Sequence, residues 1–600
     1  MRRPLTIRLL LALTALVLAM LVNALPALAD SLQPATVTLT MKAGSSTTVA
    51  KTYHLDALPG AADIVLAIDT TGSMGPAIAQ AKADATNIVT QVQAQIPGAR
   101  FAVVDFKDYP NVGQYPPFTF GGAGDYPYLL KAPFTSSAAV VSAAIGTMSA
   151  SGGGDGPEAY NRTFFEAVND PALVYNPAAV RFLIVLGDNI GHDPVQNSTF
   201  SACPNTSPLD PGRDTILGTA DDIHTSAAIN GLTAANDKLL MISYGSFLSC
   251  YSQLAGATGG TAVSSGGSGT LPGIIVNAIK AAAAHIGEAH LAVTGPCTLV
   301  TAGGSIGFSP SSYTNVTAPV DLAFTETIRA PTLVGTYTCE VQGFADGVPR
   351  GNPEEISVTV VAGAPAKVVL SPAAATNVVG EQHCETATVT DTFGNPVPNV
   401  SVVFNVPTSP ATHASPSSGV STTNASGEAT FCFTASLPGV DEIDAAVDSN
   451  GNGVWDASDT PQAAPASKVW TLPPSTSFCT VKITNGGWII ANNGDRSNFG
   501  GNANVDSSGN PTGEEEYQDQ GPAQPMNVHS TKITATTCDS ARQHASIFGE
   551  ATIDGSGTWI FRIDVTDMGE PSTNDAYGIM LSNGYDSGMK PLQGGNIDIH

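Results

Sequence analysis

The chain has 600 residues, of which 42% are hydrophobic and only 12% are charged. A chain of this length is too long for one hydrophobic core, and the usual domain size suggests about four units. The 24 basic and 51 acidic residues give a net charge of −27, which disfavours nucleic acid and anionic membranes as partners because both are negatively charged.

The first 29 residues have the pattern of a signal peptide. Three arginines among the first eight residues precede an apolar stretch from Leu9 to Leu25, and Ala27 and Ala29 form a small-residue cleavage site. Cleavage before Asp30 would release the chain from the cytoplasm without a transmembrane anchor, and an uncleaved anchor is the alternative. We therefore expect a secreted, extracellular protein.

Residues 31–58 predict a β hairpin, because Val37, Leu39 and Met41 alternate with polar residues before a turn. A lone hairpin is at best marginally stable in water and needs a sheet to join. We predict that it joins residues 288–363 in a β sandwich that the intervening domain interrupts. A β cap on the intervening domain is the alternative.

Residues 61–286 alternate buried strands with helices, which predicts a doubly wound α/β domain. The run from Ile64 to Ile68 is continuously apolar, as in a parallel strand buried on both faces. Apolar residues then recur at helical spacing from Ile78 to Ile96, where Pro97 and Gly98 end the helix. Further strands are expected at residues 101–106, 182–186 and 239–244, and a last helix at residues 273–285.

A group of oxygen-bearing side chains follows the first strand of this domain. Asp69 ends the strand, and Thr71 and Ser73 lie in the same loop. Ligands of open α/β sheets bind beyond the carboxyl ends of the strands, and a carboxylate with two hydroxyls suits Mg²⁺ or Mn²⁺. The same residue types also favour a helix N-cap, which is the alternative for the motif alone.

The segment from Asp69 to Met74 resembles the metal-ion-dependent adhesion site of the von Willebrand factor A family, with Thr71 in place of the usual first serine. The loop from Gly152 to Glu158 resembles the Asp-x-Pro-Glu loop of the integrin β version of this domain. These resemblances imply a set of primary ligands, which are Asp69, Thr71, Ser73, Glu158 and Asp188. They also imply a secondary cation held by Asp108 and Asp155.

The same resemblance implies divalent-cation-dependent binding of an acidic group on a protein or surface partner, without catalysis. A third, flanking cation site of integrin β chains needs acids just after the motif. Here those positions are Gly75, Pro76 and Ala77, which predicts that the flanking site is missing.

Residues 364–471 resemble the bacterial immunoglobulin-like domain of the invasin/intimin type. The resemblance lies in the segments Ala366–Pro372, Thr390–Val400 and Thr423–Ala429, and it implies a rigid stalk at a bacterial cell surface. A loop in this module has the ligand spacing of a calcium site, and a turn built from Asn and Gly is the alternative. The candidate Ca²⁺ ligands are Asp448, Asn450, Asn452, Asp456 and Asp459.

After a linker at residues 472–477, the chain ends in a further β-rich unit at residues 478–600. Its segments Gly509–Gly513, Tyr517–Pro522, Pro525–Ser530 and Gly594–His600 resemble the post-COAP domain of bacterial secreted proteins. The resemblance implies a β sandwich. The whole chain is thus expected to combine one α/β doubly wound domain with several all-β immunoglobulin-like sandwiches.

The eight cysteines fall in pairs within the predicted domains. Eight cysteines allow 105 pairings, and confinement to one domain favours the sequential one. The predicted disulfides are Cys203–Cys250, Cys297–Cys339, Cys384–Cys432 and Cys479–Cys538. Together the observations predict a secreted, metal-dependent adhesion protein, with a passive spacer whose metal only stabilises the domain as the alternative.

Overall fold

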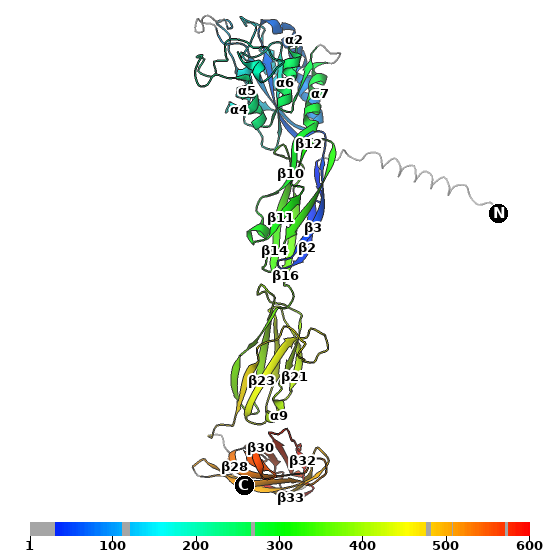
Figure 1. Cartoon of the computed structure of the whole chain (residues 1–600), viewed down its shortest axis with the longest axis vertical. Coiled ribbons are helices and arrows are strands. Elements are labelled where there is room, and N and C mark those ends of the chain that lie inside the picture. Colours follow the sequence, from blue (N-terminus) through cyan, green and yellow to red (C-terminus); the bar gives the residue numbers. More distant parts are fainter. Residues whose placement is uncertain are drawn as a thin grey trace, which may run out of the picture. The chain divides into compact units, whose positions relative to one another are not determined.

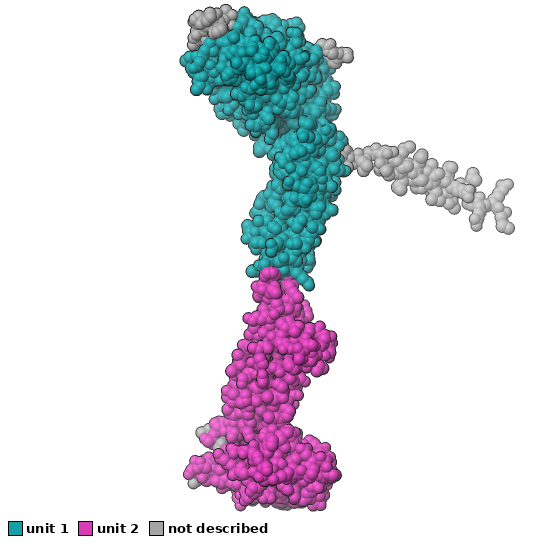
Figure 2. Space-filling model, viewed as in Figure 1, with its two compact units in different colours: residues 1–360 teal, residues 361–600 magenta. Residues whose placement is uncertain are grey.

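The computed structural model describes residues 30–110, 120–265, 270–475, 480, 482–506, 508–569 and 574–600. The predicted signal peptide and Cys479 lie outside these ranges. Within them, none of the helices combines the length and apolar character needed to span a membrane. The chain forms two compact units, divided between Val360 and Val361, which Figure 2 colours separately.

The α/β domain contains one six-stranded sheet in the order β6-β5-β4-β7-β8-β9. Its strands are β4 (Ala61–Asp69), β5 (Gly98–Phe106), β6 (Leu129–Thr135), β7 (Val180–Gly187), β8 (Asp237–Ser243) and β9 (Thr261–Ser264). All neighbours pair in parallel except β6, which runs antiparallel to β5. The edge strand β6 has no counterpart in the sequence prediction.

Helices cover both faces of this sheet, as Figure 1 shows. Their bounds are α2 (Gly75–Gln95), α3 (Ala138–Gly146), α4 (Tyr160–Asn169), α5 (Thr225–Ala234), α6 (Leu248–Ala257) and α7 (Leu271–Ala284), with short 3₁₀ helices η1 (Gly72–Met74) and η2 (Gln196–Ser198). Along β4, Ile64, Leu66 and Ile68 pack against α2, α3 and α7, whereas Val65 and Ala67 pack against α4, α5 and α6. This double burial explains the continuous apolar run and confirms the predicted α/β fold.

A β sandwich is built from strands on both sides of the α/β domain in the sequence. Its strands are β1 (Ser31–Gln33), β2 (Thr36–Lys42), β3 (Ser46–Leu55), β10 (His285–Thr294), β11 (Ser305–Ser309), β12 (Ser312–Thr317), β13 (Val320–Arg329), β14 (Gly335–Ala345), β15 (Val348–Pro349) and β16 (Glu354–Val361), with a short helix α8 (Thr298–Thr301). One sheet has the order β1-β3-β13-β11 and the other β12-β10-β14-β16-β2. The segment before the α/β domain therefore supplies strands to both sheets.

The second unit begins with another two-sheet sandwich. Its elements are β17 (Lys367–Ser371), β18 (Ala374–Val378), β19 (His383–Thr390), β20 (Ser401–Asn405), α9 (Ser409–Thr412), β21 (Ser418–Thr422), β22 (Glu428–Phe433), β23 (Gly439–Val447) and β24 (Ala466–Thr471). The sheets have the orders β17-β19-β22 and β18-β24-β23-β20-β21. Their facing side chains form one core around Trp470, whose indole N–H donates to Asp441 Oδ2 at 2.8 Å.

The last part of the chain, for which a β sandwich is predicted, forms one continuous antiparallel sheet. The strands are β25 (Ile483–Ile490), β26 (Arg496–Val505), β27 (Pro511–Asp519), β28 (Met526–Cys538), β29 (His544–Ile553), β30 (Ser556–Thr566), β31 (Ala576–Leu581), β32 (Lys590–Pro591) and β33 (Gly594–Ile599). Register shifts interrupt the β28–β29 pairing at Ser530/Lys532 and Ile533/Ala535. Such irregularities increase local twist, and the side chains of one face gather in a single core.

Three of the predicted disulfides are present: Cys203–Cys250, Cys297–Cys339 and Cys384–Cys432. The pairing of Cys538 with Cys479 stays a prediction, because Cys479 is outside the described residues.

Candidate metal centre

Three adjacent strands of the α/β sheet end at one edge, and a predicted metal ligand lies at or just beyond the end of each. Asp69 is the last residue of β4, Asp108 follows the end of β5 by two residues, and Asp188 follows β7 directly. Because β4 pairs in parallel with both β5 and β7, the three aspartates come to the same edge of the sheet.

Asp69 is fully buried, and both of its carboxylate oxygens accept hydrogen bonds. Oδ1 accepts from the Thr71 backbone N–H at 2.9 Å and from the Thr71 hydroxyl at 2.7 Å, and Oδ2 accepts from the Tyr160 hydroxyl at 2.9 Å. Thr71 is the N-cap residue of η1, but in this described segment its hydroxyl donates to Asp69 and makes no capping bond. Ser73 is exposed and opens the motif to solvent.

The loop at residues 151–158 closes over the motif. Gly153 has φ +72°, and a Cβ built there would lie 2.9 Å from Glu158 Oε1 and 3.1 Å from Thr71 Cβ. Glu158 and Thr71 therefore flank the same glycine. This places the Glu158 carboxylate close to Thr71, whose hydroxyl donates to Asp69, although Glu158 is far from both in the sequence.

The carboxyl groups at this edge carry strongly shifted acidities. Burial raises the pKa of Asp69 to about 6, despite the hydrogen bonds that it accepts. Burial, followed by the charges of Asp69 and three other aspartates at this edge, raises the pKa of Glu158 to about 10. A site with these properties favours either protons or a cation, because adjacent carboxylates repel one another.

Lys107 places an ammonium group among these acids. Its Nζ donates to the Ser151 carbonyl at 2.6 Å and also to the Thr70 carbonyl, so it ties the end of β5 to both ligand loops. Burial lowers the pKa of Lys107, against the charges of Asp105 and other nearby acids. Sequence reasoning gave Lys107 no role, because a lysine after a strand carries no signal of which carbonyls it will meet.

Two carboxylate oxygens near Asp69 are buried without a hydrogen-bond donor in the described part of the chain: Glu158 Oε2 and Asp188 Oδ1. Buried polar atoms are normally paired, since an unpaired one is costly. With Asp69, Thr71 and Ser73, these residues offer carboxylate and hydroxyl oxygens of the kind that Mg²⁺ and Mn²⁺ prefer. The donor set therefore fits the predicted ion.

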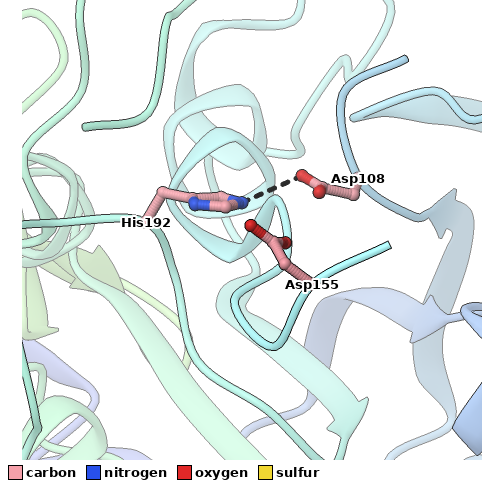
Figure 3. Close-up of side chains that lie close together, drawn as sticks. All are labelled: Asp108, Asp155 and His192. Carbon is pink, nitrogen blue, oxygen red and sulfur yellow. Dashed lines mark hydrogen bonds and ion pairs between the residues drawn. The ribbon is translucent and has the colours of Figure 1, made fainter. Parts of the chain in front are cut away.

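A second cluster lies beside the first and contains a residue that the sequence analysis missed. Asp108, Asp155 and His192 offer ligand atoms that all lie within 4.8 Å of one another. Figure 3 shows the three side chains pointing toward one another, with His192 Nε2 at 3.0 Å from Asp108 Oδ1. Burial lowers the pKa of His192, but the hydrogen bond to Asp108 and the nearby acidic charges outweigh it and raise this pKa overall.

Tyr160 is a third residue of this edge, after Lys107 and His192, that sequence reasoning missed. It begins α4, two residues after Glu158, and its hydroxyl accepts from the Asn189 N–H at 3.2 Å while donating to Asp69. Tyr160 therefore links the loops after β4 and β7. Only its position close to Glu158 hints at this role in the sequence.

The calcium loop and the absence of the flanking site both stay predictions. Gly75, Pro76 and Ala77 begin α2 and contribute no side-chain oxygen to this edge. In the candidate calcium loop, Asp448 accepts backbone N–H bonds from Gly451 to Gly453, and Asp456 accepts from the amides of Asn450 and Asn452. The loop is thus held by its own hydrogen bonds, and calcium binding by Asp448 and its neighbours, Asp459 included, stays a prediction.

Comparisons with known proteins bear on separate parts of the chain. Residues 356–460 match the family model of the bacterial Ig-like domain (group 1), which confirms the predicted immunoglobulin-like module. No curated protein matches the chain. Among solved structures, a von Willebrand factor type A protein from Catenulispora acidiphila is similar at 15% identity, with a TM-score of 0.25, over 56% of this chain and 75% of that one.

Proposed function

We propose that this chain is a secreted binding protein that holds Mg²⁺ or Mn²⁺ at the Asp69 site and uses it to capture an acidic group on a protein or surface ligand. The observation that carries the proposal is the pair of unpaired buried oxygens, Glu158 Oε2 and Asp188 Oδ1, near Asp69. The resemblance of the Asp69 motif to the metal-ion-dependent adhesion site supports the same conclusion.

Some residues of the site would hold the metal ion by their charge, and others leave it accessible to a partner. A bound Mg²⁺ or Mn²⁺ would offer an open coordination position to a carboxylate of the partner. Asp69, Glu158 and Asp188 supply the negative charge that retains a dication, and Thr71 adds a hydroxyl. Exposed Ser73 lies on the side from which a partner can approach. No catalytic step is part of this proposal.

The rest of the chain supports an extracellular setting. Three disulfides are typical of proteins outside the cytoplasm, and the first 29 residues have the pattern of a signal peptide. The bacterial Ig-like match suits a stalk at a bacterial cell surface. In this proposal the β modules carry the α/β domain, and the partner is neither nucleic acid nor membrane.

A structural role for the metal is the second candidate. Asp69 is fully buried and Glu158 is 3% exposed, as in a site whose ion serves only to stabilise the domain. Under this alternative the chain is an extracellular spacer, and the metal would raise its thermal stability without creating a binding surface.

Calorimetric titration of Mg²⁺ and Mn²⁺ into the chain starting at Asp30 tests the site, with Asp69→Ala as the variant. Asp84→Ala is the matched control, because it removes another carboxylate of the same domain, in α2. The same proteins are then applied to arrays of peptides rich in Asp and Glu, in Mg²⁺ and in EDTA. We expect Mg²⁺-dependent capture by the wild type and by Asp84→Ala, and no capture by Asp69→Ala.

Two other outcomes have defined meanings. If metal raises the melting temperature but no array member is captured, the spacer function replaces the proposed one. If Asp69→Ala binds Mg²⁺ and Mn²⁺ as tightly as the wild type, the assignment of the site itself is wrong.

A further inference from the structure

Asp108, Asp155 and His192 come from three different connections of the α/β domain. Asp108 follows β5, Asp155 lies in the loop before α4, and His192 follows β7 by five residues. Their ligand atoms converge within 4.8 Å, as Figure 3 shows. An ion at this point would tie the three connections together.

Several polar atoms of this cluster are buried without a hydrogen-bond partner among the described residues. Asp108 and His192 are both 0% exposed. Within the described ranges, Asp108 Oδ2, Asp155 Oδ1 and His192 Nδ1 are buried and have no hydrogen-bond partner. Each such atom carries a desolvation penalty of its own, so three of them in one cluster point to a bound group.

Two contacts hold members of the cluster in place. The Tyr109 backbone N–H donates to Asp108 Oδ1 at 2.8 Å, which fixes one carboxylate. The Phe120 ring packs against the imidazole of His192, with ring centroids 4.7 Å apart and the ring planes at 48°. Such contacts are typical of a built metal site, because second-shell contacts orient the ligands.

The imidazole decides the class of ion. Carboxylate and hydroxyl sets such as the Asp69 site suit Mg²⁺, whereas an imidazole ligand suits zinc and its first-row neighbours. We propose that Asp108, Asp155 and His192 form a site for a first-row transition-metal dication, with His192 as the ligand that selects it over Mg²⁺ and Ca²⁺. The sequence resemblance alone implies only an unspecified secondary cation at Asp108 and Asp155.

Calorimetric titration of Zn²⁺, Mg²⁺ and Ca²⁺ tests the proposal in an Asp69→Ala background, with any affinity tag removed. The background removes the Asp69 carboxylate, so the result does not depend on the proposed function. His192→Asn is the test variant, because it replaces the imidazole by an oxygen ligand. His529→Asn is the matched control, since His529 belongs to the other His-containing cluster of possible ligands in the described residues, with Glu514 and Glu516.

We expect the Asp69→Ala chain to bind one Zn²⁺ at least about 10-fold more tightly than Mg²⁺ or Ca²⁺, because an imidazole ligand suits Zn²⁺. Adding His192→Asn should weaken Zn²⁺ binding by about 10- to 100-fold and leave Mg²⁺ binding within about twofold. Adding His529→Asn should leave the tight Zn²⁺ event unchanged. Circular dichroism in EDTA shows whether each variant is folded, and the visible absorption of bound Co²⁺ reports on the imidazole ligand in the folded chains.

The proposal is overturned if Zn²⁺ binds no more tightly than Mg²⁺ in the Asp69→Ala background, or if His529→Asn abolishes the tight event. It also fails if Co²⁺ gives the same spectrum in His192→Asn and its parent. If His192→Asn does not fold, the Co²⁺ spectrum and the imidazole NMR shifts of the parent chain become the deciding measurements. An NMR signal of His192 that stays unchanged on Zn²⁺ addition would then refute the site.

Discussion

At the scale of single residues, Tyr160 is instructive because it lies outside the predicted ligand set and yet holds Asp69. Its hydroxyl donates to Asp69 Oδ2 at 2.9 Å and is fully enclosed. Removing a group that orients a ligand typically weakens metal binding by about 10- to 100-fold. We expect Tyr160→Phe to lower the affinity for Mg²⁺ and Mn²⁺ by this factor, as measured by calorimetry, with the domain still folded.

The control for this change is Tyr244→Phe. The Tyr244 hydroxyl donates to Gln80 Oε1 at 3.2 Å in the same domain and not to a candidate ligand, so its loss should leave the metal affinity unchanged. Equal affinities for Tyr160→Phe and the wild type would show that the Tyr160 hydroxyl does not orient Asp69.

Gly153 offers a second test at this scale. Its φ of +72° is unfavourable for other residues, and a Cβ would meet Glu158 Oε1 at 2.9 Å. We expect Gly153→Ala to lower the free energy of unfolding by about 1–2 kcal/mol and to weaken Mg²⁺ binding, since Glu158 must move. Urea titration measures the stability of each variant. Gly124→Ala is the control, because its Cβ would meet nothing within 4 Å, and it should change the free energy of unfolding by less than about 0.5 kcal/mol.

The ligands differ in how far the sequence reveals them. Asp69 could be placed at a strand end because an apolar run stops there, and Thr71 and Ser73 follow it directly. His192 could not be placed, because one histidine among loop residues shows no spacing to Asp108 or Asp155. Its neighbourhood is created by the order of β5, β4 and β7, which is a tertiary property.

At the scale of elements, the last sheet contains a buried acid in β27. Glu515 is 2% exposed, and both of its carboxylate oxygens accept from Asn485 Nδ2 at 3.0 Å. Burial raises the pKa of Glu515 to about 8, against the hydrogen bond from Asn485. The folded sheet therefore keeps a proton that the unfolded chain releases at a lower pH.

This difference predicts that the last sheet loses stability as the pH rises. Between the ordinary glutamate pKa of about 4.5 and about 8, the unfolded state binds fewer protons, so the free energy of unfolding should fall by up to about 1.4 kcal/mol per pH unit. Below this window Glu515 is protonated in both states, so the free energy of unfolding no longer depends on pH through this group and its stabilisation is fully present. Urea titrations at pH 5 and pH 8, read by pulsed hydrogen exchange of β27 peptides, measure it.

Glu515→Gln should remove this part of the pH dependence, because an amide does not titrate. Glu514→Gln is the matched control, since Glu514 is the adjacent and exposed acid and should leave the slope in place. A slope that survives Glu515→Gln would assign the pH dependence to another group.

The elements also show what limits prediction from sequence. Helix α2 was predictable because apolar residues recur along it and Pro97 stops it. The single curled sheet of β25 to β33 was not, because alternation shows which residues of a strand are buried but not which strands are hydrogen-bonded. The register shifts in β28 at Ser530 and Ile533 have no marker in the sequence either.

At the scale of the whole molecule, the segment before the α/β domain belongs to a sandwich completed after it. Strand β3 lies between β1 and β13 and pairs with β13 from Val320↔Leu55 to Arg329↔Ser46. Lys51 in β3 is buried at 2% exposure and forms ion pairs with Glu326, at 3.3 Å, and with Glu354. The sandwich therefore depends on contacts of Lys51 with residues 275 and 303 positions further along the chain.

A chain that starts at Gly60 should consequently lose this sandwich but keep the bacterial Ig-like module. It lacks β1, β2 and β3, and it leaves Glu326 and Glu354 without Lys51, which is costly for buried carboxylates. Limited proteolysis with mass spectrometry should show cleavage at residues 285–361 under conditions that leave the chain from Asp30 intact. Residues 364–471 should stay protected in both chains, because neither of their sheets contains a strand from before Val361. Equal protection of residues 285–361 in the two chains would contradict the dependence of the sandwich on the segment before Gly60.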